Sequence, residues 1–128
     1  MLLDSNVIIY AAKPEHEGLR RLIAEHAPAV SAVSYVEVLG YHELTGRELR
    51  YFKEFFAAAP VLGIGATVLD QAVRLRQLRK MTLGDAFVAG TALTHRLTLV
   101  TRNTGDFRWI PDLSVLDPFE NNSGQQPT

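Results

Sequence analysis

The chain has 128 residues, 47% of them hydrophobic, which suits one globular domain with a sizeable core. Thirteen basic and 14 acidic residues give a net charge of −1, which neither requires nor excludes a polyanionic partner. The chain has no cysteine, which excludes disulfides, thiolate nucleophiles and sulfur-ligated zinc and leaves oxygen and imidazole as the available metal ligands.

The chain carries no pattern typical of export or membrane insertion. Its N-terminus lacks a basic segment and reaches a charge at Asp4, unlike a secretory signal. The longest uncharged stretch, residues 55–69, is interrupted by Pro60, Gly63 and Gly65 and is shorter than the ~20 apolar residues of a spanning helix. We therefore expect a soluble protein located in the cytoplasm, without a membrane partner.

Strand-like and helical patterns alternate along the chain, without a linker or an internal repeat. Residues 2–3 predict a strand, residues 6–12 and 15–26 two helices, and residues 29–32 a second strand. Residues 34–44 and 46–59 predict helices, followed by a strand at 61–64 and helices at 66–80 and 85–96. Two strands, at 97–101 and 114–116, complete the series. Such repeated βα units predict a mostly parallel sheet covered by helices on both faces. We expect one domain over residues 1–119 and a flexible tail over residues 120–128.

Four acidic residues, Asp4, Glu37, Asp85 and Asp106, lie just beyond a strand-like run or at a predicted helix start. The carboxyl ends of parallel strands gather along one edge of a sheet, so acids placed there meet in one crevice. Clustered carboxylates require a cation to offset their repulsion. The pattern therefore predicts a metal site.

Each acid also has a purely structural interpretation. Ser34 and Glu37 have the S-x-x-E spacing of a capping box, and Thr82 and Asp85 offer the same alternative at a helix start favourable to negative charge. The other two acids fit an ordinary helix entry and an ordinary turn. Capping explains one acid at one helix start, but it does not explain four in this order.

Four segments carry a resemblance to a known family. They are LLDSNVIIY at residues 2–10, SAVSYVEVLG at 31–40, GDAFVAGTAL at 84–93 and LVTRNTGDF at 99–107. In this order and spacing they resemble the PIN-domain family, and within it the VapC-type toxin ribonucleases of bacterial and archaeal toxin–antitoxin pairs. One departure is Ser5, where the family often has threonine after the first aspartate. A hydroxyl is retained, so we expect little consequence.

The resemblance implies a three-layer α/β/α domain with a central, mostly parallel five-stranded sheet, and metal-dependent hydrolysis of RNA. Mg²⁺ and Mn²⁺ prefer oxygen ligands and keep several waters, which suits a carboxylate site that must also admit phosphate. The expected metal ligands and catalytic residues are Asp4, Glu37, Asp85 and Asp106. Behind them, the side chains expected to orient a carboxylate or a water are Ser5, Thr101 and Asn103.

The resemblance also implies partners: an RNA substrate, a cognate antitoxin protein and a second copy of the chain in a homodimer. Basic residues that are candidates for RNA contact are Arg74, Arg76, Arg79, Lys80 and Arg102. The alternative for the basic run is a solvated helix face.

Two rival functions stay open at this stage. One is a PIN-type nuclease outside toxin–antitoxin systems, acting in RNA maturation or on DNA flaps. The other is a non-catalytic, receiver-like regulatory domain, which also combines a doubly wound sheet with an acidic magnesium pocket in a chain of this length.

Overall fold

A single parallel sheet forms the centre of the molecule. The computed structural model describes residues 1–120, and in it all five strands pair in parallel in the order β3-β2-β1-β4-β5. The strands are β1 (Leu2–Leu3), β2 (Ala29–Ser31), β3 (Val61–Leu62), β4 (Leu99–Val100) and β5 (Val115–Leu116). The predicted tail lies outside the described residues from position 121 onward.

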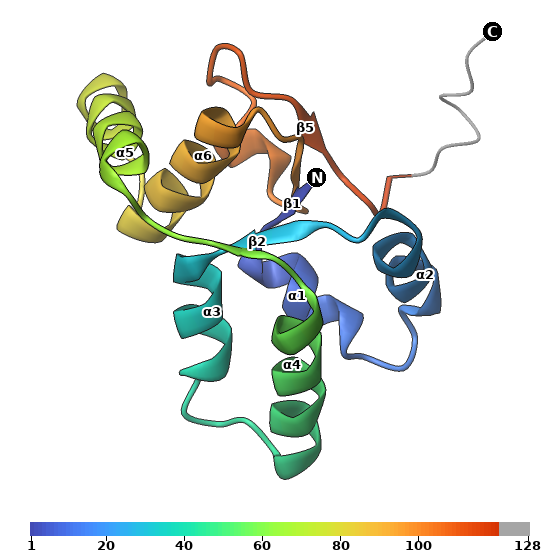
Figure 1. Cartoon of the computed structure of the whole chain (residues 1–128). Helices are drawn as coiled ribbons and strands as arrows, with labels where there is room; N and C mark the ends of the chain where they lie inside the picture. The colour runs from blue at the N-terminus through green and yellow to red at the C-terminus, as the bar shows by residue number, and fades with distance from the viewer. Residues whose placement is uncertain (121–128) are drawn as a thin grey trace, which may run out of the picture.

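Helices cover both faces of this sheet (Figure 1), so the predicted three-layer α/β/α architecture is confirmed. The helices are α1 (Ser5–Ala11), α2 (Glu17–His26), α3 (Ala32–Leu39), α4 (Gly46–Ala58), α5 (Ala66–Leu78) and α6 (Leu83–His95). Helices α5 and α6 cover one face, and α1 to α4 lie toward the other. A short 3₁₀ helix, η1 (Thr104–Asp106), follows β4.

Two hydrophobic cores lie on the two faces of the sheet, because successive side chains of a strand point to opposite faces. Leu3 of β1 and Val100 of β4 pack into the core formed with α1 to α4. Leu2 and Leu99, their neighbours in the same strands, pack into the core formed with α5 and α6. The inner strands are therefore buried on both sides, as expected for a parallel sheet.

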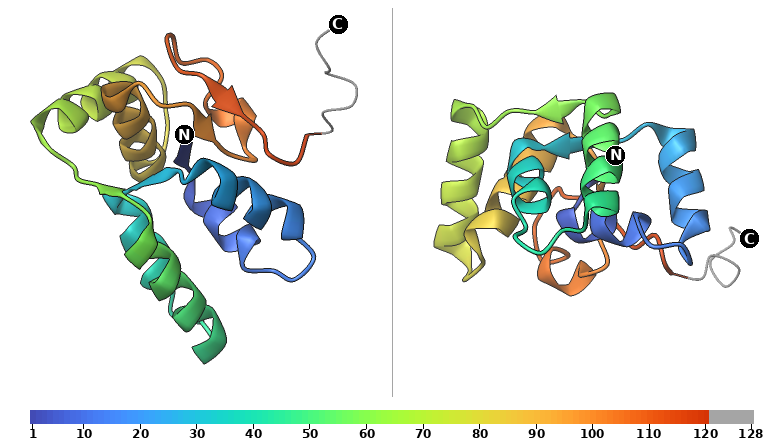
Figure 2. Two further views of the ribbon diagram at one scale, coloured as in Figure 1. Left: turned by 45° about the vertical axis from the view of Figure 1, so that its right-hand side comes forward. Right: turned by 90° about the horizontal axis from the view of Figure 1, so that it is seen from below.

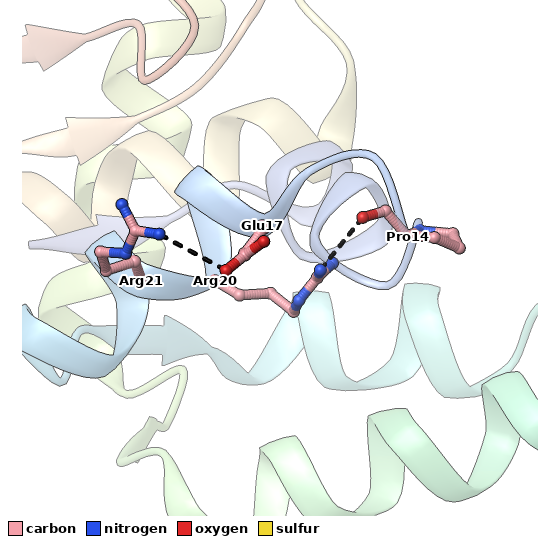
Figure 3. Close-up of polar contacts among 4 residues, drawn as sticks. All are labelled: Pro14, Glu17, Arg20 and Arg21. Atoms are coloured by element: carbon pink, nitrogen blue, oxygen red, sulfur yellow. Dashed lines mark hydrogen bonds and ion pairs between the residues drawn. The ribbon is translucent and has the colours of Figure 1, made fainter.

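The connection between α1 and α2 is held by one arginine of α2. Arg20 donates to the backbone carbonyls of Ala11 at 2.9 Å, Lys13 at 2.6 Å and Pro14 at 3.1 Å. Figure 3 shows the Arg20 contact with Pro14 beside the exposed Glu17–Arg21 pair of the same helix. The guanidinium thus satisfies carbonyls at the end of α1 and orders the turn that follows.

Helices α3 and α4 run side by side away from the sheet (Figure 2). The beginning of α4 carries a complete capping box between Thr45 and Glu48. The predicted limits of α3 were wrong at both ends: the helix begins at Ala32 because Ser31 caps it by accepting from the Val33 amide at 3.1 Å. It stops at Leu39, with Gly40 as C-cap, five residues before the predicted end.

The strand order has two consequences. A receiver-like domain has the flavodoxin-like order 2-1-3-4-5, so the observed order 3-2-1-4-5 overturns that alternative. The chain leaves β1 toward β2 on one side and later returns to pair β4 on the other side. The carboxyl ends of β1 and β4 therefore form the topological switch point, where open α/β sheets bind their ligands.

Among residues 1–120, no helix is both long enough and apolar enough to cross a lipid bilayer.

Candidate active site

Asp4 sits at the switch point and joins its two sides. It follows β1, caps α1 by accepting from the Ser5 amide through Oδ1 at 2.8 Å, and accepts from the Thr101 hydroxyl through Oδ2 at 2.8 Å. Thr101, which follows β4, in turn accepts from the Asn103 amide at 3.1 Å. Asp4 is only 6% exposed, and this burial raises the pKa of its carboxyl above 3.8. The two hydrogen bonds oppose that shift, and the charges of Glu37 and Asp106 reinforce it.

Glu37 is held toward Asp4 by a pair of serines and does not cap α3. Its Oε1 accepts from Ser5 Oγ at 2.7 Å, and Ser5 Oγ lies 2.8 Å from Ser34 Oγ. A hydroxyl has one proton, so when Ser5 donates to Glu37 it must accept from Ser34. The capping-box interpretation of Ser34 and Glu37 is therefore wrong: Ser34 is fully buried inside α3 and supports the Ser5 hydroxyl.

Asp85 lies in the first turn of α6, which Thr82 caps by accepting from the Asp85 amide at 3.1 Å. Burial raises the pKa of the Asp85 carboxyl to about 6, and the charges of Asp4, Asp106 and Glu37 add to the shift. The charges of the other three acids therefore reach Asp85.

Gly84 explains how Glu37 approaches the start of α6. A Cβ atom at Gly84 would lie 2.6 Å from Glu37 Oε2, closer than a real contact allows. Because Gly84 has no side chain, the Glu37 carboxylate can lie against the first turn of α6.

Asp106 ends η1 and is exposed at the rim of the site. Its backbone carbonyl accepts from Trp109 Nε1 at 2.9 Å, which fixes the indole ring beside it. With Asp85, it lines a hollow of about 500 Å³ that also contains Arg76, Arg79, Lys80 and Trp109.

The four acids come from separate segments, the charges of Asp4, Glu37 and Asp106 all add to the raised pKa of Asp85, and their donor atoms suit a hard cation. Carboxylate and hydroxyl oxygens are the ligands that Mg²⁺ and Mn²⁺ prefer, and the buried Asp4 carboxylate and the raised pKa of Asp85 mark a region that positive charge would stabilise. Within residues 1–120, however, no three His, Cys, Asp or Glu side chains are close enough to share one ion directly. Carboxylates of like charge repel each other, so a shared ion requires side-chain rotation or bridging water.

The predicted supporting residues are only partly in the expected roles. The hydroxyls of Ser5 and Thr101 each hold one acid, whereas Asn103 contributes through its backbone amide. Ser34 and Gly84 were not predicted as parts of the site. Their sequence signals, S-x-x-E and G-D, do occur, but each has a common structural meaning in isolation.

The predicted basic residues divide into two groups. Arg76, Arg79 and Lys80 line the hollow, whereas Arg74 does not and donates to Gln71 instead. Arg102 lies elsewhere: its guanidinium stacks on the rings of Tyr10 and Phe119 at 5.2 and 4.7 Å, and the His16 ring contacts both aromatic rings edge-on.

Comparisons with known proteins place the chain in a family. A family model described as PIN domain matches residues 1–112. A toxin–antitoxin complex from Klebsiella pneumoniae contains a chain that is 28% identical, with a TM-score of 0.73 over 94% of this chain and 98% of that one. Two further structures share the fold. DNA-bound VapBC from Salmonella typhimurium is 22% identical, with a TM-score of 0.80 over 91% and 96% of the chains. FitAcB from Neisseria gonorrhoeae is 24% identical, with a TM-score of 0.76 over 94% and 99%. No curated protein matches the chain significantly in sequence.

Proposed function

The chain belongs to the PIN-domain family, and from that membership we propose that it is a metal-dependent endoribonuclease, the toxin of a toxin–antitoxin pair. The observation that carries the proposal is the electrostatic coupling among the acids near the switch point. Asp4 is fixed there by Thr101, and Asp85 feels the charges of Asp4, Glu37 and Asp106. A structural role alone does not explain why four helix-start and turn acids share one electrostatic environment.

In this proposal Asp4, Glu37, Asp85 and Asp106 hold Mg²⁺ or Mn²⁺, directly or through water. When bound, such an ion activates water at neutral pH and offsets charge that develops on the phosphoryl oxygens. Asp4 is the rigid member, because both of its oxygens accept a hydrogen bond from a group at the sheet edge. Glu37 is positioned by Ser5, and Asp85 and Asp106 face the hollow through which a phosphate group would enter.

Cleavage of RNA by purified protein, with Mn²⁺ or with a chelator, tests the proposal. We expect Asp4→Asn and Asp85→Asn to lower the cleavage rate about 100-fold or more, because each removes one proposed metal ligand. The matched control is Asp70→Asn, which removes an exposed carboxylate of α5 and should leave cleavage unchanged. Undiminished cleavage by both site variants would refute the assignment.

An antitoxin protein is the proposed regulator. The support is the similarity to chains solved as toxin–antitoxin complexes, together with the high coverage of both chains. A short reading frame in the same transcript would encode the candidate. The encoded protein should co-purify with this chain at a fixed ratio and abolish RNA cleavage. If the two proteins did not bind each other, the proposed toxin–antitoxin pair would be refuted.

A homodimer is also proposed, on the basis of exposed apolar side chains along α5 and the start of α6. Leu69, Val73 and Leu83 are 45%, 56% and 53% exposed and border one apolar hollow. Such a patch is typical of an association surface. Sedimentation equilibrium at micromolar concentration should give twice the 14.2 kDa chain mass. A monomeric mass would refute the dimer.

A further inference from the structure

The segment after β4 is attached to helix α1 at two places. Thr101, which follows β4, donates its hydroxyl to Asp4, the N-cap of α1, at 2.8 Å. The next residue, Arg102, lies with its Cζ atom 5.2 Å from the centroid of the Tyr10 ring, in the last turn of α1. These two anchor points are about 9 Å apart along the helix axis. The segment that leads to Asp106 is therefore held against both ends of α1.

A ring from the C-terminal segment, residues 117–120, completes the second attachment. Phe119 lies after β5, and the Arg102 Cζ atom is 4.7 Å from the centroid of its ring. Phe119 also meets Tyr10 edge-on, with 5.6 Å between the ring centroids. The guanidinium thus lies over two rings at once, and the negative face of each ring attracts it. We call this arrangement of Arg102, Tyr10 and Phe119 the ring contact.

Phe119 is itself held in place. Its amide donates to Asp117 Oδ1 at 2.8 Å, which fixes the turn after β5. Its ring packs against the core formed with α1 to α4. The ring of His16, the N-cap of α2, lies 4.9 Å from it between centroids, and Figure 1 shows the chain running from β5 toward α2. The C-terminal segment therefore presents a well-supported aromatic face to Arg102.

The ring contact gives Arg102 a role other than the RNA contact that its charge suggests. The hollow beside the acids is lined by basic residues at the end of α5 and just after it, whereas the Arg102 guanidinium lies over two aromatic rings. A cation held in this way restrains the backbone that carries it. That backbone continues directly into Thr101 on one side and Asn103 on the other.

We propose that Phe119 is a positioning residue for the active site. It holds Arg102, and through the adjoining backbone it keeps the Thr101 hydroxyl on Asp4. The inference rests on the proposed ribonuclease function, which it deepens by adding the C-terminal segment to the parts that the site requires. Loss of the ring contact loosens both the group that orients Asp4 and the loop that carries Asp106. Groups that are fixed before a ligand arrives bind it at a lower ordering cost.

Amide hydrogen exchange tests the ring contact without metal or RNA. The reporter is the Asn103 amide, which donates to Thr101 Oγ1 at 3.1 Å. The internal reference is the Glu48 amide, which donates to Thr45 in the capping box of α4 at 3.1 Å. Phe119→Leu keeps an apolar side chain without an aromatic face, so we expect exchange at Asn103 to accelerate about fivefold and exchange at Glu48 to stay unchanged. Equal acceleration at both amides would indicate general destabilisation and overturn the proposal, as would no acceleration at either.

Further variants separate the ring contact from charge in general. Phe119→Tyr retains the aromatic face and should restore the wild-type exchange rate. Arg102→Ala should accelerate exchange as much as Phe119→Leu, and the double variant should add nothing, because both changes remove the same contact. The control is Arg108→Ala, which removes an exposed arginine paired with Glu120 of the C-terminal segment at 4.0 Å and should change the rate less than about twofold. Equal acceleration in Arg108→Ala and Arg102→Ala, or additive effects in the double variant, would overturn the proposal.

Metal binding and cleavage connect the ring contact to the site. Calorimetric titration should give Phe119→Leu a Kd for Mn²⁺ about fivefold higher than that of the wild type. In saturating Mn²⁺, kcat should fall about fivefold and KM should change less than about twofold, because Phe119 acts through other residues and does not touch RNA. A higher KM with unchanged kcat in Arg102→Ala, together with a weaker salt dependence of RNA binding, would make Arg102 an RNA contact and overturn the positioning role.

These measurements separate the inference from the proposed function. Faster exchange at Asn103 and weaker Mn²⁺ binding in Phe119→Leu, without RNA cleavage by the wild type, would refute the ribonuclease and leave the positioning role standing. RNA cleavage by the wild type, with unchanged exchange in Phe119→Leu and Arg102→Ala, would refute the positioning role and leave the ribonuclease standing.

Discussion

At the scale of single residues, structural and functional roles coincide at the same side chains. Asp4 is an ordinary helix cap for α1 and also the buried carboxylate at the switch point. Asp85 follows the ordinary Thr82 cap and also feels three other acids. The two interpretations that the sequence offers for these acids are therefore not exclusive. Only Glu37 departs from its capping role, because its carboxylate reaches Ser5.

Gly84 offers a test of how Glu37 is positioned. Gly84→Ala places a methyl group against the Glu37 carboxylate, which must rotate away from Ser5. We expect about a tenfold loss of cleavage rate with the fold intact, since alanine is the better helix former. Gly18→Ala is the matched control, because Gly18 is also the second residue of its helix and has nothing within 4 Å of an added Cβ. Similar activity of both variants would contradict the positioning role.

The raised pKa of Asp85 predicts a pH dependence of stability. A carboxyl whose pKa rises from 3.8 to about 6 on folding binds its proton more tightly in the folded state. Ionisation of Asp85 therefore lowers the free energy of unfolding as pH rises from about 4 to 6. Above that range the loss of stability is complete. Asp85→Asn should remove it and stabilise the protein by about 1 kcal/mol at pH 7, a value reduced for solvent screening of a half-exposed group. Urea unfolding of the wild-type protein and Asp85→Asn at pH 4 and pH 7 measures this gain in stability. If the two proteins differed in free energy of unfolding by the same amount at both pH values, the raised pKa of Asp85 would be disproved.

At the scale of elements, the site depends on how closely α5 and α6 pack. A Cβ at Gly90 of α6 would lie 3.1 Å from the Val68 carbonyl oxygen and 3.4 Å from the Ala72 amide nitrogen, both backbone atoms of α5. Glycine thus permits the helices to approach, and this contact holds the basic end of α5 beside the start of α6.

Gly90→Val should force the two helices apart. We expect a loss of about 1–3 kcal/mol in the free energy of unfolding, because the atoms that must move belong to the backbone. Gly63→Ala serves as the comparison, since an added Cβ there meets nothing within 4 Å. Thermal unfolding of the two variants measures the effect, and equal Tm values would show that the helices adapt without cost.

The order and type of the α-helices and strands in residues 1–120 were predictable, because apolar runs mark the strands and helical periodicity marks the helices. The junction of β2 and α3 was not, since both Ser31 and Ser34 are suitable caps and the strand pairing of Ser31 decides between them. The four acids stand out because strand ends and helix starts are visible in sequence, and their role as one site stays a prediction. The contributions of Ser34 and Gly84 were not predictable, because they depend on contacts between segments far apart in the chain.

At the scale of the whole molecule, the strand order brings these segments together. The switch point between β1 and β4 places residues from the two ends of the sequence side by side, as the hydrogen bond between Thr101 and Asp4 illustrates. Repulsion among the gathered acids destabilises the folded state, and a divalent ion that binds only that state would reverse the effect.

Metal binding should therefore raise thermal stability. With Mn²⁺ at about 100 times its Kd, we expect a gain of about 2.7 kcal/mol, or roughly 8 °C in Tm. The gain should disappear with chelator and in Asp85→Asn, and it should persist in Asp70→Asn, whose lost carboxylate is exposed on α5. A Tm that is indifferent to Mn²⁺ would argue against the site independently of any activity measurement.

Strand β1 is so short that the residues that pack the two cores directly precede the acid at the switch point. With two residues in β1, one side chain serves each core, and the next residue is Asp4. Deleting Leu2 or Leu3 would either leave one leucine for two cores, if Asp4 kept its place, or draw Asp4 into the strand and away from Thr101, if the strand kept its place. In either case packing and the position of the carboxylate are lost together. We therefore expect such deletion variants to misfold, and not to fold normally with only their activity lost.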